Sequence, residues 1–223
     1  MGELFNSNPQ PTLGFPESLT ESYKPREISA FVGLAKHKAI LTKLAANPRS
    51  CGLLFWGGPG SGKSSMAFAF SRAIDAEIHH APSQDCKLET LQSIVATCHR
   101  VPYDFQTGKT CKFHAVIIDE ADLLSSAAQN YLLSKLDGTA PCPSTIFILT
   151  ANSIDKFEDR FISRLIQLPK FNGYGSGEDI RALLTRIWKE RAPADAPMPD
   201  LDRVPTSNVR DALQFLEIEL LSV

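Results

Sequence analysis

Short apolar runs alternate with helical patterns along the middle of the chain. The helical patterns cover residues 63–74, 88–100 and 127–136. The apolar runs are typical of strands buried on both faces of a sheet, and they are Gly52–Trp56, His114–Asp119, Thr145–Thr150 and Leu165–Leu168. Glu77–His80 is a further, weaker candidate strand. Because strands separated by helices imply βαβ crossovers, the pattern predicts an α/β fold with a parallel sheet covered by helices on both faces.

The pattern changes on either side of this unit. Residues 1–22 are polar and proline-rich, so we expect a flexible N-terminal arm, followed by a base domain over 23–170 that opens with a helix at 34–46. A glycine-rich stretch predicts a hinge at 171–177. Beyond it, apolar positions recur at helical spacing in two segments separated by a proline-rich loop, so residues 178–223 are expected to form a small helical lid.

Composition excludes several classes of protein. The 223 residues are 43% hydrophobic with a net charge of −2, so no global positive field attracts nucleic acid or anionic membrane. No signal peptide or apolar run of membrane-spanning length is found, so we expect a soluble, cytoplasmic protein without a membrane partner. The five cysteines form no CxxC pair. Cys98 with His99, or Cys111 with His114, could meet around a metal, but free buried cysteine in a reducing compartment is the simpler interpretation.

The glycine-rich turn after the first strand carries the strongest chemical signal. Residues 57–64 match G-x-x-x-x-G-K-[ST] in full, with a predicted strand before them and a helix after them. Glycines let backbone N–H groups surround phosphates, and the helix N-terminus adds partial positive charge. The pattern assigns Lys63 to the β- and γ-phosphates and the Ser64 hydroxyl to Mg²⁺. The candidate nucleotide-binding residues here are Gly57, Gly58, Pro59, Gly60, Ser61, Gly62, Lys63, Ser64 and Ser65.

Two carboxylates end the third predicted strand. Asp119 is the candidate to hold Mg²⁺ together with Ser64, and Glu120 is the candidate general base for an attacking water. Asn152 follows the fourth strand, where its side chain could reach the γ-phosphate and this water. The expected cofactors are therefore ATP and Mg²⁺.

Three arginines could supply positive charge to a transition state. Arg160 and Arg164 lie beyond the fourth strand, where they could point at a neighbouring subunit, and Arg210 opens the last helix, from which it could reach the nucleotide across the hinge. A surface ion pair is the default role for each of them.

In this order the motifs resemble the AAA+ superfamily, and within it the clamp-loader clade. Residues 19–26 are similar to the clade's opening motif and 31–33 to its next box, which implies nucleotide-binding roles for Tyr23, Pro25, Val32 and Gly33. Asp119–Asp122 is similar to its Walker B motif, and Asn152 stands at its sensor-1 position.

Two of these arginines lie in segments that resemble further motifs of that clade. Ser163-Arg164 is similar to its Ser-Arg-Cys motif, with Leu165 in place of the cysteine, which favours Arg164 over Arg160 as a trans-acting finger. Residues 208–212 resemble its sensor-2 motif with Arg210 in the key place, although Ser207 and Asn208 stand where Gly and Asp are usual.

The resemblance implies a five-stranded parallel sheet of order 5-1-4-3-2, a helical lid, and active sites shared within a homo- or hetero-oligomer.

The leading hypothesis is an ATPase that acts on DNA or on a replication, recombination or repair protein. Clamp loaders continue past the lid into a helical collar, whereas this sequence stops at the end of the lid, as expected either of a fragment or of a minimal member with a different assembly. An alternative is therefore a nucleotide-dependent assembly module with little turnover. A P-loop kinase is disfavoured by the sensor and finger motifs. Direct DNA binding stays open, with the candidate basic residues Lys36, Lys38, Lys43, Arg49, Lys109 and Lys112.

Overall fold

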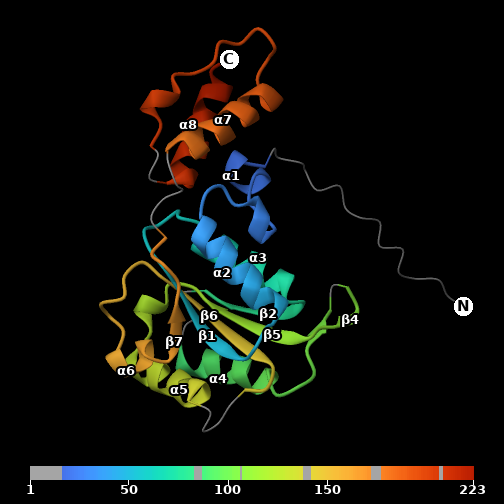
Figure 1. Ribbon diagram of the computed structural model, residues 1–223, viewed down its shortest axis with the longest axis vertical. Helices are drawn as coiled ribbons and strands as arrows, with labels where there is room; N and C mark the ends of the chain where they lie inside the picture. The colour runs from blue at the N-terminus through green and yellow to red at the C-terminus, as the bar shows by residue number, and fades with distance from the viewer. Residues whose placement is uncertain (1–16, 83–86, 106, 138–141, 172–176, 206–207) are drawn as a thin grey trace, which may run out of the picture.

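A parallel sheet forms the centre of the molecule, and two helices stand apart from it as a lid (Figure 1). The computed structural model describes residues 17–82, 87–105, 107–137, 142–171, 177–205 and 208–223. Within the described part of the chain, no helix is both long and apolar enough to cross a membrane.

The large sheet has five strands in the order β2-β5-β6-β1-β7, all parallel. Their bounds are β1 Cys51–Trp56, β2 Ala76–Ala81, β5 Phe113–Ile118, β6 Thr145–Ala151 and β7 Leu165–Gln167. Numbered along the chain, these five strands stand in the predicted order 5-1-4-3-2. The register pairs Trp56 with Ala151 and Ile118 with Leu149. The segments that follow β1, β5 and β6 therefore leave the sheet at one edge.

Helices cover both faces of the sheet, as the alternation of elements predicts. On one face, α2 (Ala35–Ala46) and α3 (Lys63–Ala73) bury Leu41 and Phe70 against the strands, and on the other α4 (Leu88–Thr97) and α5 (Ser126–Leu136) bury Leu91 and Leu132. Each of these four side chains is at most 1% exposed, and full burial of such a side chain stabilises the fold by roughly 1.5–3 kcal/mol. The helix α6 (Asp159–Ile162) leads into β7.

A small antiparallel hairpin was not predicted. It consists of β3 (Tyr103–Asp104) and β4 (Lys109–Thr110), and Gly108 adopts a φ of 68° in its turn. Strands of two residues are too short to produce an alternating pattern, so the sequence carried no signal for them.

The lid is built from α7 (Gly177–Arg191) and α8 (Val209–Leu221). Leu184 and Trp188 on α7 share a buried cluster with Leu213 and Leu216 on α8. The 3₁₀ helix η4 (Leu201–Arg203) lies between these two helices in the chain, and η1 (Ile28–Ala30) contacts α2 and α3 of the base. Most of the predicted hinge, at 172–176, lies outside the described residues, and Gly177 already begins α7.

The N-terminal arm was expected to continue to residue 22, and this was wrong for its last residues. Leu19–Ser22 forms a short helix, α1, whose Ser18 side chain accepts a hydrogen bond from the Glu21 N–H. Leu19 is 7% exposed, and its N–H donates to the Glu217 carboxylate on α8 (3.2 Å). Figure 1 shows α1 lying beside the lid. This segment is ordered by packing against residues about 200 positions away in the chain. Its polar composition gave no indication of that contact.

Candidate nucleotide-binding site

The P-loop joins β1 to α3 and encloses the Lys63 ammonium group. Lys63 is only 8% exposed. Its Nζ donates to the carbonyl oxygens of Gly57 (2.9 Å) and Gly58 (2.7 Å) and to Asn152 Oδ1 (3.2 Å). The structure thus brings the predicted lysine and the polar residue after β6 into direct contact.

The charge of Lys63 is set by burial and by its neighbours. Burial lowers the pKa of this lysine, the Asp122 carboxylate opposes that shift, and Arg210 adds to it. The Asp122 carboxylate also accepts the Asn152 N–H (3.3 Å), which fixes the start of the loop after β6. A cation largely removed from water interacts more strongly with a neighbouring anion than an exposed cation does.

Asp119 stands at the centre of a second hydrogen-bonded group. Its Oδ1 accepts from the hydroxyls of Ser64 (2.7 Å) and Thr150 (2.8 Å), and its Oδ2 lies 2.7 Å from His80 Nε2. The Thr150 hydroxyl also accepts the Glu120 N–H (3.2 Å). The predicted pair of Ser64 and Asp119 is therefore in contact, and Thr150 and His80, which the sequence analysis did not select, hold the carboxylate in place.

These oxygen atoms fit a magnesium site. Mg²⁺ prefers hard oxygen ligands, and two adjacent ligands of an octahedral Mg²⁺ stand about 2.9 Å apart. The Ser64 and Asp119 oxygens are separated by 2.7 Å. Glu120 directly follows Asp119, is exposed, and has a left-handed backbone with φ of 51°.

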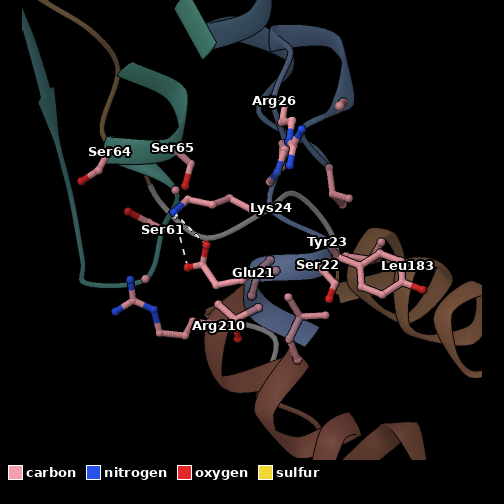
Figure 2. Close-up of a pocket in the computed structure, with 18 of the residues that line it drawn as sticks. Glu21, Ser22, Tyr23, Lys24, Arg26, Ser61, Ser64, Ser65, Leu183 and Arg210 are labelled. Atoms are coloured by element: carbon pink, nitrogen blue, oxygen red, sulfur yellow. Dashed lines mark hydrogen bonds and ion pairs between the residues drawn. The ribbon is translucent and has the colours of Figure 1, made fainter. Parts of the chain in front are cut away.

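A pocket of about 400 Å³ lies between the P-loop, the N-terminal segment and the lid (Figure 2). Its lining includes these sequence-predicted residues: Tyr23, Pro25, Val32, Gly60, Ser61, Gly62, Lys63, Ser64, Ser65 and Arg210. The other predicted loop residues, Gly33, Gly57, Gly58 and Pro59, are not part of this lining. Asp119, Glu120 and Asn152 are also outside it, and Asp119 and Asn152 connect to it through Ser64 and Lys63. Leu183, Arg186 and Leu213 of the lid complete the wall, and the sequence analysis had not selected them.

The lid rests on the P-loop at Gly60. This glycine has a φ of 68°, and a Cβ added to it would stand 2.1 Å from Asn208 Oδ1. Asn208 caps α8, because its Oδ1 accepts the Arg210 N–H (2.9 Å). The close approach of this cap to Gly60 places Arg210 at the pocket wall, where Figure 2 shows it near the P-loop serines.

Tyr23 links the opposite wall of the pocket to α7. Its hydroxyl donates to Glu190 Oε2 (2.7 Å) and accepts from Arg191 Nε (3.2 Å), and the Arg191 guanidinium lies 5.6 Å from the ring centroid. The tyrosine predicted to bind the nucleotide therefore also holds the lid helix.

The two candidate finger arginines are not at this pocket. Arg164 is 50% exposed and pairs with the Asp137 carboxylate, and Arg160 is 60% exposed and pairs with Glu158 (2.8 Å). Neither belongs to the pocket lining. Both side chains face outward from the region where α6 leads into β7.

Comparison with known proteins decides the family. Residues 53–170 match the model of the ATPase family associated with various cellular activities (AAA). The chain belongs to the AAA ATPase family. That match spans all five strands of the large sheet except the first two residues of β1, and it includes the P-loop, Asp119 and Asn152.

Similar sequences within the AAA family carry clamp-loader names. Replication factor C small subunit 1 of Pyrobaculum arsenaticum is 33% identical over 146 residues, which cover 65% of this chain and 44% of that protein. Replication factor C small subunit 2 of Pyrobaculum islandicum is 31% identical, over 68% of this chain and 47% of the relative. Human replication factor C subunit 4 is 26% identical, over 91% and 58%. This AAA chain thus spans about half the length of the relatives it matches.

Solved structures show the same fold. A RuvB mutant of Thermotoga maritima matches with a TM-score of 0.66 at 16% identity, over 90% of this chain and 66% of the RuvB chain. At this identity the likeness concerns the AAA fold alone.

Proposed function

We propose that this chain is a subunit of a clamp-loader-like AAA ATPase that binds and hydrolyses ATP·Mg at subunit interfaces. The cycle drives remodelling of DNA or of a DNA replication, recombination or repair complex. One observation carries the proposal: a single pocket combines the P-loop with a lid arginine, and the Lys63–Asn152 and Ser64–Asp119 contacts adjoin it.

Each candidate residue has a role that its position supports. The P-loop amides and Lys63 bind the phosphates, and Ser64 and Asp119 hold Mg²⁺, with Asp119 fixed by Thr150 and His80. Mg²⁺, when bound, neutralises phosphate charge. Glu120 orients the attacking water and accepts its proton.

One residue beside the pocket and one in its lining can stabilise further charge. Asn152 holds the Lys63 ammonium in place, and Arg210 adds a guanidinium from the lid side. Both act on charge that develops on the phosphates. Tyr23, Pro25 and Val32 form the wall that faces the rest of the nucleotide.

The position of Arg164 favours a site shared between subunits. Its guanidinium is half-exposed and lies outside the pocket of its own chain. A guanidinium suits the phosphate charge of a transition state, so Arg164 would act in a neighbouring subunit of a homo- or hetero-oligomer. Work on DNA or on replication proteins is proposed because the similar proteins are named replication factor C subunits.

A mixing experiment tests the shared site. The ATPase rate is measured against protein concentration, with and without DNA, for the wild type, Glu120→Gln and Arg164→Ala, and for an equimolar mixture of the two variants. Each variant alone should be nearly inactive. Random mixing in a closed ring pairs an intact Glu120 with an intact Arg164 at about a quarter of the interfaces, so about a quarter of the activity should return.

Arg160→Ala is the matched control, because it removes a nearby exposed arginine with its own ion pair. It should keep its activity. A mixture that stays inactive although the oligomer forms, or an Arg164→Ala variant with wild-type turnover, would refute the shared site. A different result would identify the chain as a nucleotide-dependent assembly module. In that case the oligomer forms only with ATP, and the ATPase rate of Glu120→Gln equals the low rate of the wild type.

A further inference from the structure

A second group of titratable side chains lies on the face of the sheet that α4 covers. His79 comes from β2, His114 from β5, and Cys98 from the C-terminal cap of α4. Cys98 and His114 are 0% and 1% exposed, and His79 is 13% exposed. None of the three belongs to the pocket described above.

Their donor atoms converge on one point. His79 Nε2 and His114 Nδ1 are 3.0 Å apart, and with Cys98 Sγ all three atoms lie within 4.8 Å of one another. Two nitrogen ligands of a tetrahedral Zn²⁺ stand about 3.3 Å apart, because Zn–N bonds are about 2.0–2.1 Å long. Small side-chain movements would bring the group to metal-binding distances.

The surroundings of His114 fix which ring nitrogen is available. Its Nε2 lies 2.9 Å from the Arg100 carbonyl oxygen, which can only accept, so Nε2 carries the proton and donates it. In the neutral ring, Nδ1 is then a lone pair that faces His79. Metal-binding histidines commonly donate their other N–H to a backbone carbonyl in this way.

Glu77 adds negative charge beside the two rings. Its Oε2 lies 3.3 Å from His114 Nδ1, and its Oε1 lies 3.9 Å from His79 Nε2. A lone pair on His114 Nδ1 and a carboxylate oxygen at this distance repel each other. A cation between them would remove that repulsion, and the Tyr103 N–H already holds the carboxylate in place (2.8 Å).

We propose that His79, Cys98 and His114 bind a divalent transition-metal ion with affinity for sulfur, Zn²⁺ above all, with Glu77 beside it. Two imidazoles and a thiolate form a donor set that suits Zn²⁺ and not Mg²⁺. The ion would tie the end of α4 to β2, the edge strand of the sheet, and so act as a structural clip.

Cobalt titration of the full chain tests the proposal. The protein is stripped with a chelator and returned to buffer with Mg²⁺, and Co²⁺ is added as a spectroscopic substitute for Zn²⁺. We expect one Co²⁺ per chain, with a thiolate-to-cobalt charge-transfer band that Zn²⁺ abolishes. Zn²⁺ should also raise the unfolding temperature of the stripped chain, because a ligand that binds only the folded state stabilises it.

Variants separate this site from other metal binding. Cys98→Ser should remove the charge-transfer band. His79→Gln, at the most exposed position of the three, should weaken Co²⁺ binding about 10–100-fold while circular dichroism shows an intact fold. Cys142→Ser is the matched control, since it removes a neighbouring buried thiol outside the three and should keep the band. A folded wild-type chain without the band, an unchanged band in Cys98→Ser, or unchanged affinity in His79→Gln would overturn the proposal.

Discussion

The two walls of the nucleotide pocket are built in different ways. The base wall contains Lys63 and Ser64, which are fixed by hydrogen bonds to the P-loop carbonyls, to Asn152 after β6 and to Asp119 after β5. The lid wall contains the exposed Arg210, and a few contacts such as Tyr23 with Glu190 hold it. The register of parallel strands thus determines the groups proposed for chemistry, whereas a small number of surface contacts determine how the pocket closes. Substitutions in the base wall should therefore reduce ATP binding and hydrolysis more than substitutions in the lid wall.

The largest effect is expected from Lys63→Ala in the base wall. The variant loses the buried cation beside the phosphates, and loss of one such group costs about 10²–10³-fold in rate. The ATPase rate and ATP binding by calorimetry measure this. Lys109→Ala, on the exposed hairpin strand β4, is the control and should behave as the wild type. A Lys63→Ala rate within twofold of the wild type would contradict the assignment of the base wall.

A smaller effect is expected where the two walls touch. Gly60→Ala forces a left-handed backbone on alanine, at a cost of about 1–2 kcal/mol, and places its methyl group against Asn208. Since the lid must shift away, we expect ATP affinity to fall about tenfold, as measured with a fluorescent ATP analogue. Gly58→Ala is the control within the same loop, because its Cβ would meet nothing within 4 Å. Equal losses in both variants would show that the contact between lid and P-loop has no part in binding.

The smallest effect is expected from Tyr23→Phe in the lid wall. The change removes only the hydroxyl that bonds Glu190 and Arg191. Such hydrogen bonds contribute about 0.5–1.5 kcal/mol net, so ATP affinity should fall about two- to tenfold with little change in the maximal rate. Tyr103→Phe, on the hairpin, should leave both quantities unchanged. A larger fall in maximal rate than in affinity would place Tyr23 in the chemistry instead of in lid closure.

The sequence predicted the sheet well because its signals are local. Three of the five strands, β1, β5 and β6, are mostly continuous apolar runs next to a helical pattern, and Gly57–Ser64 forms one uninterrupted motif. The hairpin and α1 escaped prediction because strands of two residues show no period, and because Leu19 packs on α8 across almost the whole chain.

The predicted site lacked residues that are distant in the sequence but adjacent in the structure. His80 and Thr150 reach Asp119 only through strand pairing, although their places near the ends of β2 and β6 were a usable signal. The histidines and cysteines were compared with sequence neighbours, such as Cys98 with His99. The register instead pairs His114 with Glu77 across the ladder and so brings His79 near His114, and α4 places Cys98 beside the two rings.

The contacts of the N-terminal segment have a mechanical consequence. The chain enters the lid after Phe171, and the lid is held a second time where Leu19 meets Glu217 and Tyr23 meets Glu190. The lid is therefore tethered by more than the segment that follows Phe171, because the N-terminal segment also contacts both of its helices. Domain closure commonly turns on a few such residues. We therefore expect opening of the lid to require these two hydrogen bonds to break or the N-terminal segment to move with it.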